Sequence, residues 1–135
     1  MRQLFGSGKG PLLLGICLIA ALAGGCGPER ADAPGVEVDC KLEPSPPVVG
    51  DAQVSLTLTG PDQKPIQGAD VRLEGNMNHA GMKPSFADLR ETEPGRYTGT
   101  LEFTMGGDWF VIVTAKTPDG KTIERKIDVP GVQSQ

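Results

Sequence analysis

The feature that most constrains the fold of this chain is a period-two alternation of apolar and polar residues, which runs through most of the sequence after residue 35. In the first such segment, residues 36–42, every second residue is apolar and each residue between is charged. Side chains of a strand point alternately to opposite faces, so this pattern predicts half-buried strands of an antiparallel sheet. The segments that share it are residues 36–42, 54–59, 71–74, 97–105 and 123–129. A sustained helical period of 3.6 residues is found in none of them, which argues against a helical domain.

Two further segments and the turns between them complete the predicted architecture. Residues 109–115 are apolar on both faces and indicate a central strand, while residues 85–91 give a weaker seventh strand. Gly or Pro occupies 31 of the 135 positions, and the segment Pro118–Lys121 is a strong hairpin turn signal. Six or seven short strands separated by turns predict an all-β fold, an immunoglobulin-like antiparallel β-sandwich. A small barrel is the alternative.

The N-terminal segment has the features of a targeting sequence. Arg2 and Lys9 precede an apolar run at residues 11–22, which is too short to span a bilayer comfortably. The run ends in Leu22-Ala-Gly-Gly-Cys26, which resembles a bacterial lipobox, although Ala23 stands where the pattern more often has Leu. The resemblance implies that residues 1–25 are a lipoprotein signal peptide that is removed, and that Cys26 carries the lipid. We therefore expect a membrane-anchored protein of the cell envelope that faces the periplasm or the cell exterior; an ordinary signal peptide with an incidental Cys is the alternative.

Cleavage before Cys26 would leave 110 residues. We expect a lipidated Cys and polar tether at residues 26–35, one β-sandwich domain at 36–131 and a polar tail at 132–135. The mature chain would hold 11 basic and 17 acidic residues, a net charge of −6. An acidic chain lacks the basic face that nucleic acids require, so we expect no nucleic-acid partner. Cys40 would be the only free thiol, and its place among apolar residues predicts a buried, inert side chain.

The chemistry-bearing residues gather in one predicted loop. The segment 75–84 contains the only His of the protein, His79, together with Met77 and Met82. Thioether and imidazole groups suit copper, Cu(I) above all. Met105, at the end of the strand 97–105, would be a fourth ligand if the two strand ends meet. Trp109 would then lie close enough to cover a bound cation with its ring.

Structural explanations of the same residues remain open. Met is a common core filler, and Met105 continues the inward face that Tyr97, Leu101 and Phe103 define on its strand. The loop would then be part of a structural or protein-interaction module of the envelope, with the Met side chains as an adaptable apolar surface for a protein partner. We expect no enzyme, because no nucleophile motif or His relay is found in the sequence.

The order of these features resembles the YtkA-like domain, a family that includes FixH-like proteins. The resemblance rests on Gly50–Leu58, Pro65–Leu73, Met77–Met82, Pro94–Tyr97 and Leu101–Trp109. It implies an exported or membrane-anchored β-sandwich, in a family of which some members are associated with copper handling and cytochrome oxidase maturation. The family loop often holds more Met and His than this one. A single His79 therefore favours an exchangeable, Met-rich Cu(I) site over a tight Cu(II) site.

Overall fold

The computed structural model describes residues 34–135, which form seven antiparallel strands and no helix. No helix in this part of the chain is therefore able to cross a membrane. The strands are β1 (Glu37–Glu43), β2 (Gly50–Thr59), β3 (Asp70–Asn76), β4 (Ser85–Glu93), β5 (Arg96–Phe103), β6 (Gly107–Lys116) and β7 (Thr122–Val132). The predicted signal peptide, the lipidation site Cys26 and most of the tether lie outside the described residues. Every strand and every core residue that the structure describes lies within residues 37–132, so a fragment that begins at residue 27 contains all of them.

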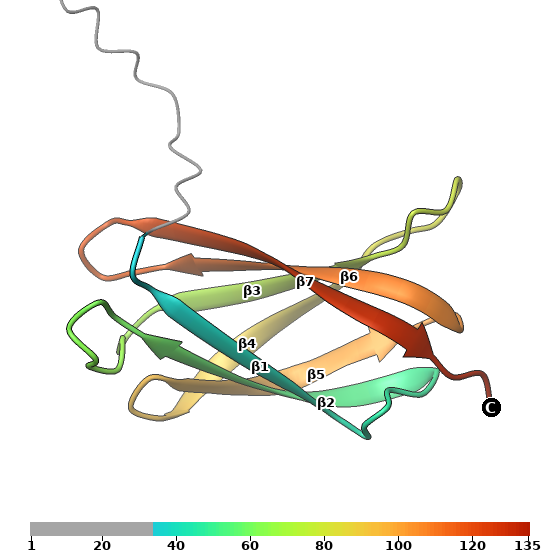
Figure 1. The fold of residues 1–135 in the computed structure, drawn as a ribbon, viewed down its shortest axis with the longest axis horizontal. Coiled ribbons are helices and arrows are strands. Elements are labelled where there is room, and N and C mark those ends of the chain that lie inside the picture. The colour runs from blue at the N-terminus through green and yellow to red at the C-terminus, as the bar shows by residue number, and fades with distance from the viewer. Residues whose placement is uncertain (1–33) are drawn as a thin grey trace, which may run out of the picture.

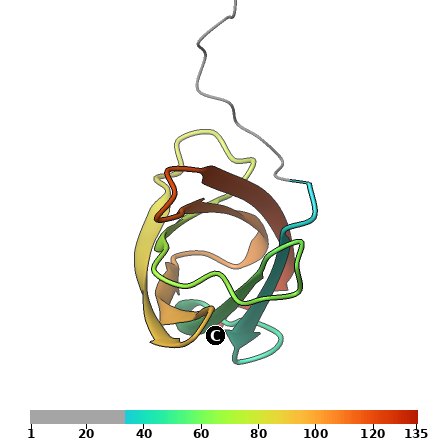
Figure 2. The ribbon, with the colours of Figure 1, turned by 90° about the vertical axis from the view of Figure 1, so that its left-hand side faces the viewer.

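The strands follow one another in the order β1-β2-β5-β4-β3-β6-β7, with each neighbouring pair antiparallel. Strand β4 joins the two layers, because Ser85–Leu89 pair with β3 whereas Arg90–Glu93 pair with β5, with a bulge between Glu91 and Glu93. Figure 1 shows the two layers along their length, and Figure 2 shows the strands surrounding a common interior. The predicted all-β class is confirmed, and the fold combines a sandwich with a barrel that is left open between β1 and β7.

The alternation in the sequence explains the core. On β2, for example, Val54, Leu56 and Leu58 are buried, while the residues between them lie on the outer face. The largest fully buried side chains come from five strands; they are Tyr97, Phe103, Leu56, Leu58, Leu73, Leu101, Ile123, Val54, Val71, Val111 and Val113. Their removal from water is the main source of stability for this domain.

Strand β6 differs in part from the prediction. It lies between β3 and β7, as a central strand must, but only one of its faces is buried. Trp109, Val111 and Val113 point inward, whereas Phe110 and Ile112 are only half-buried on the outer face. The Lys126 ammonium lies 4.7 Å from the centre of the Phe110 ring, so a cation covers part of this apolar surface in place of a second protein layer.

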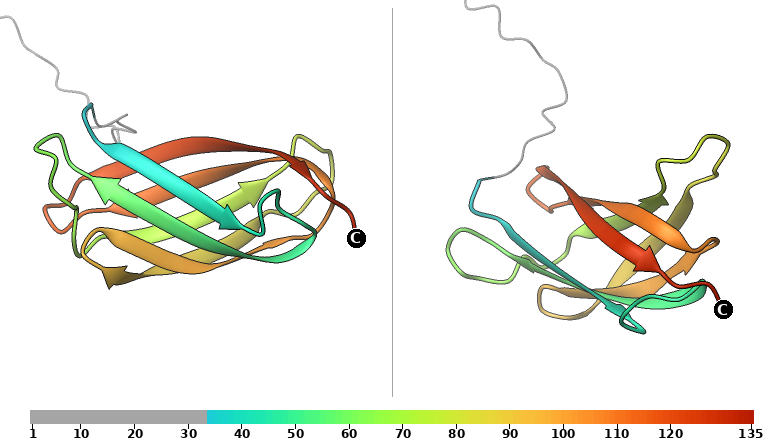
Figure 3. Two further views of the ribbon diagram at one scale, coloured as in Figure 1. Left: turned by 60° about the horizontal axis from the view of Figure 1, so that its bottom comes forward. Right: turned by 45° about the vertical axis from the view of Figure 1, so that its right-hand side comes forward.

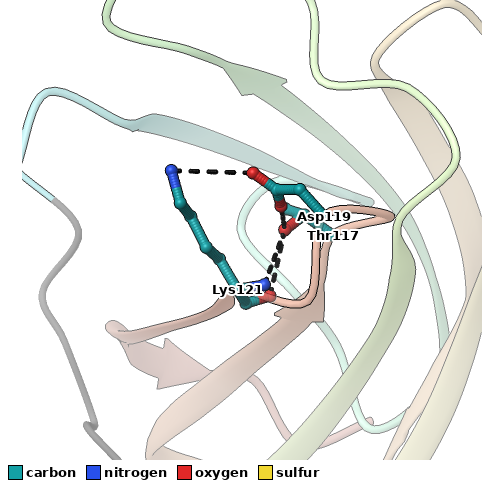
Figure 4. A network of polar contacts seen from close by, with 3 residues as sticks. All are labelled: Thr117, Asp119 and Lys121. Carbon is teal, nitrogen blue, oxygen red and sulfur yellow. Dashed lines mark hydrogen bonds and ion pairs between the residues drawn. The ribbon is translucent and has the colours of Figure 1, made fainter.

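The hairpin predicted at Pro118–Lys121 is present between β6 and β7. The backbone N–H of Thr117 donates to the Lys121 carbonyl at 2.8 Å, which closes the turn. The Thr117 hydroxyl donates to the Asp119 carboxylate and accepts from the backbone N–H of Lys121 (Figure 4). These side chains provide hydrogen-bond partners for backbone groups of the turn that no longer have a strand partner, a role that Asp and Thr commonly play in turns.

Candidate functional site

The loop that carries most of the predicted ligands connects β3 to β4 and extends past the end of the sheets (Figures 1 and 3). Within this loop, one hydrogen bond joins two backbone groups: the Met82 N–H donates to the His79 carbonyl at 3.4 Å. His79 is exposed in this turn, whereas Met77 and Met82 are half-buried and pack against the core. The loop thus places its imidazole in solvent and its two thioether side chains against the domain.

Met77 reaches the turn between β5 and β6. A Cβ atom added to Gly107 would lie 2.9 Å from the Met77 methyl carbon, so the side chain rests directly on this glycine. Gly107 also has a φ of +125°, a conformation that residues with a Cβ rarely adopt. A glycine at this position therefore serves both the turn and the close approach of Met77.

Met105 lies in the same turn, one residue from Gly106, and the prediction that it continues the inward face of its strand is wrong. Strand β5 ends at Phe103, and 49% of the Met105 surface is exposed. The Trp109 indole N–H donates to the Met105 carbonyl at 2.9 Å, which fixes the backbone of the turn while the side chain points away from the core. Because the chain leaves the sheet after Phe103, the parity of the strand no longer decides where the Met105 side chain points.

Trp109 is a core residue and offers no open ring face for a cation. Only 2% of its surface is exposed, and it meets Phe103 edge to face with ring centres 5.1 Å apart. Its part in the site is to hold the Met105 backbone. We call the group formed by Met77, His79, Met82 and Met105 the methionine end of the domain.

The donor atoms of the methionine end are three neutral thioethers and one imidazole, a set that suits Cu(I) and is poor for hard cations. Within residues 34–135, no group of three or more His, Cys, Asp or Glu side chains is arranged to hold a metal. An exposed thioether at Met105 fits a soft-metal ligand better than a core filler, since packing does not account for it.

The other reactive side chains have structural environments. Cys40 is half-buried on β1, and burial, helped by the negative charge of Asp39, raises the pKa of its thiol to about 11. It is therefore protonated and slow to react at neutral pH. The prediction of a buried thiol holds only in part, because the side chain is half-buried. The Asp108 carboxylate accepts a hydrogen bond of 2.9 Å from the Gly131 N–H and so supports the β6–β7 bulge.

Sequence reasoning missed a polar cluster at the opposite end of the domain. The Tyr97 hydroxyl donates to the Ile66 carbonyl at 2.7 Å and accepts from the Ala69 N–H at 3.0 Å. The two oxygens of Glu91 accept from the N–H groups of Gly68 and Gly95, and these bonds, with that of Gly95 first, lower the pKa of the carboxyl. The Pro94–Tyr97 segment was the only sequence signal for this cluster, which pins the β2–β3 loop.

Comparison with known proteins gives one family match: a model described as YtkA-like matches residues 30–114. No curated protein matches the chain. Among solved structures, murine CRIg aligns at 14% identity and a TM-score of 0.40, covering 73% of this chain and 98% of that chain. The soluble domain of PmoD from a Methylocystis species aligns at 10% identity and a TM-score of 0.44, covering 74% and 90% of the two chains.

Proposed function

The chain belongs to the YtkA-like family, and we propose that it is a non-enzymatic lipoprotein of the cell envelope that holds Cu(I) at its methionine end for handling or transfer. The observation that carries the proposal is the environment of Met105. Its backbone is fixed by the Trp109 indole while about half of its surface stays in solvent. An accessible thioether carried on a fixed backbone is suited to be a soft-metal ligand.

Met77 supports the same proposal from the other side of the site. It comes from a different loop and rests on Gly107, two residues from Met105. Met82 and His79 lie on the loop that begins with Met77, so all four candidate ligands belong to two adjoining connections of the chain. Neutral ligands leave a bound Cu(I) its positive charge, so the site favours exchange with a partner over permanent retention.

A competition titration tests the proposal. Residues 27–135 are titrated with Cu(I) against a chelator, and the wild type is compared with a variant in which Met77, Met82 and Met105 are all Leu. Met and Leu have similar volumes, so packing is kept while the sulfur atoms are lost. We expect the Leu variant to lose most of its Cu(I) affinity with little change in thermal midpoint.

Two single variants separate the loss of a thioether ligand from other effects on Cu(I) binding. Met105→Leu alters only the exposed thioether and should weaken binding without any packing effect. Lys83→Ala, in the same loop, is the matched control and should bind like the wild type. Equal binding by the wild type and the triple Leu variant would remove the metal proposal.

The anchor is tested separately, because it depends on residues outside the described part of the chain. Cys26→Ser in the full-length protein should abolish lipid attachment and move the protein from the membrane fraction to the soluble fraction. Several acyl chains are needed for stable anchoring, so a protein that stays membrane-bound without Cys26 would contradict the lipoprotein assignment.

A protein-interaction module is the second candidate, and the burial of the loop side chains favours it. Met77 and Met82 pack against the core, which is how structural residues behave. In that case the projecting loop contacts an envelope protein directly. Capture of a partner would then depend on the loop and be unchanged by copper or by a chelator, whereas copper-dependent capture would support the metal site.

A further inference from the structure

The open side of the domain, between β1 and β7, has the geometry of a missing strand. In the seven-strand order the two outermost strands are β1 and β7. Every neighbouring pair is antiparallel, so β1 and β7 run in the same direction, and the parallel bridge between Val48 and Gln133 agrees with this. A single extra strand antiparallel to both would continue the alternation and complete an eight-stranded barrel, the size whose interior side chains fill.

Among the described residues, hydrogen bonds join the β1 and β7 regions at both ends of the opening but not along its middle. At one end the Arg125 guanidinium donates to the Val36 carbonyl at 3.2 Å, so a side chain takes the place of a strand partner. At the other end the Val49 N–H donates to the Gln133 carbonyl and the Gln133 N–H donates to the Pro47 carbonyl, both at 2.9 Å. Between these contacts β7 contributes residues 126–132, about 24 Å at the usual rise of a strand.

A groove of about 460 Å³ lies in this opening. Figure 3 shows β1 and β7 bordering the open side. Cys40, Leu42 and Ile127 line the groove, and all three are only half-buried although they pack against the core. Their inward faces lack the neighbour that the rest of the sheet has. We call this groove the seam.

We propose that the seam binds an extended segment of a partner protein, with apolar residues at alternate positions and basic residues between them, as an eighth strand. Backbone groups on the edge of β1, which no other described strand pairs with, supply sequence-tolerant hydrogen bonds, and the apolar floor accepts every second side chain. The basic character follows from charge: three of the four outward side chains of β1, Glu37, Asp39 and Glu43, are acidic. Pro130 removes one donor from the part of β7 that borders the opening, whereas β1 contains no Pro.

A second copy of the chain fits the seam less well. Simple pairing of two β1 edges would satisfy the backbone but leave the floor at Leu42 and Ile127 uncovered. The outward charges of two such acidic edges would also repel each other. An inserted strand satisfies both the edge and the floor.

The probe is a synthetic heptapeptide, Lys-Val-Thr-Val-Lys-Val-Lys with blocked ends, added to isotope-labelled residues 27–135. Amide shift changes in the NMR spectrum should concentrate on β1 and β7. The same peptide with Pro at its centre, which lacks one N–H, and a version with Glu for Lys should both bind at least about tenfold more weakly. Binding should also protect the Cys40 thiol from maleimide, because Cys40 lines the seam.

Two variants make the test specific. Ile127→Asp places a charge in the apolar floor of the seam, and Glu43→Lys reverses an exposed charge that folding does not need. Each variant should bind the heptapeptide more weakly than the wild type. Ile112→Asp, on the outer face of β6, is the control and should bind like the wild type.

Four results would overturn the proposal. They are the absence of shifts at saturating heptapeptide, equal binding of the Pro-containing peptide, concentration-dependent shifts of β1 and β7 without peptide, and a rise in Cys40 labelling when residues 27–33 are deleted. The third would assign the seam to a second copy, and the fourth to the chain's own N-terminal segment.

Discussion

Removal of the Tyr97 hydroxyl should destabilise the domain far more than the loss of one oxygen atom suggests. Tyr97 is fully buried, and its hydroxyl both donates to the Ile66 carbonyl and accepts from the Ala69 N–H. Tyr97→Phe keeps the ring in the core, so no large cavity forms. It leaves one backbone acceptor and one backbone donor without a partner at the base of the β2–β3 loop.

The magnitude follows from those two bonds. Each contributes about 1 kcal/mol net, and an unpaired buried group costs about 1–3 kcal/mol. Both groups are only partly shielded from water, so we expect a loss of about 2 kcal/mol in the free energy of unfolding. For a domain of this size, that corresponds to a fall of roughly 8–16 °C in the thermal midpoint.

Urea unfolding of residues 27–135, followed by fluorescence of the single Trp, measures this loss. Trp109 is buried in the core and reports global unfolding. Thr98→Val is the matched control, since it deletes a hydroxyl from the opposite face of the same strand and should change stability little. A loss below about 0.5 kcal/mol for Tyr97→Phe, with an unchanged urea slope, would refute the claim that these two bonds hold the loop.

Three further outcomes are expected from the same domain. Glu91→Gln should lower the free energy of unfolding at neutral pH, because hydrogen bonds from the N–H groups of Gly95 and Gly68 lower the folded-state pKa of Glu91 from 4.5. The stabilisation by the Glu91 carboxylate is present above pH 4.5 and is lost as the pH falls through the folded-state pKa. The stabilities of wild type and variant should therefore converge in acid. Cys40 should react slowly with a thiol reagent at pH 8, since its pKa is about 11, and rapidly once urea unfolds the chain. Leu73→Ala should cost about 2–5 kcal/mol, because Leu73 is fully buried, whereas Leu42→Ala at the edge should cost clearly less in the same urea assay.

The fold class could be predicted from local sequence patterns, because a strand with one buried face has apolar residues at every second position. They failed where tertiary contacts take over. The alternation along β5 would place the Met105 side chain inward. The chain, however, leaves the strand before Met105, in a turn that the positive φ of Gly107 and the hydrogen bond from the Trp109 indole stabilise. The half-exposure of Phe110 likewise depends on whether another layer of the protein covers the outer face of β6, which the apolar run alone does not reveal.

The same limit applies to the candidate site. The spacing of Met77, His79 and Met82 was visible in the sequence, but the contact between Met77 and Gly107 joins residues 30 positions apart. The Tyr97 cluster and the seam were invisible for a related reason. Both depend on which backbone groups the finished sheet leaves without a strand partner, and that is a property of topology.

The bulge between β6 and β7 lies next to both the methionine end and the seam, so variants that separate the two functions must leave this bulge intact. Gly107, on which Met77 rests, pairs with Val132 at the end of β7. The Asp108 carboxylate binds the N–H of Gly131, next to Pro130 of the seam. A change at Gly107 or Asp108 would therefore disturb the bulge that supports both sites, so its effect on copper or on a peptide would assign neither. Met105 precedes this bulge in the sequence and belongs only to the methionine end, whereas Ile127 lies on β7 and belongs only to the seam. A Met105→Leu variant that keeps its peptide affinity and an Ile127→Asp variant that keeps its Cu(I) affinity would establish that the two sites act independently, since coupling requires that a change at one alter binding at the other.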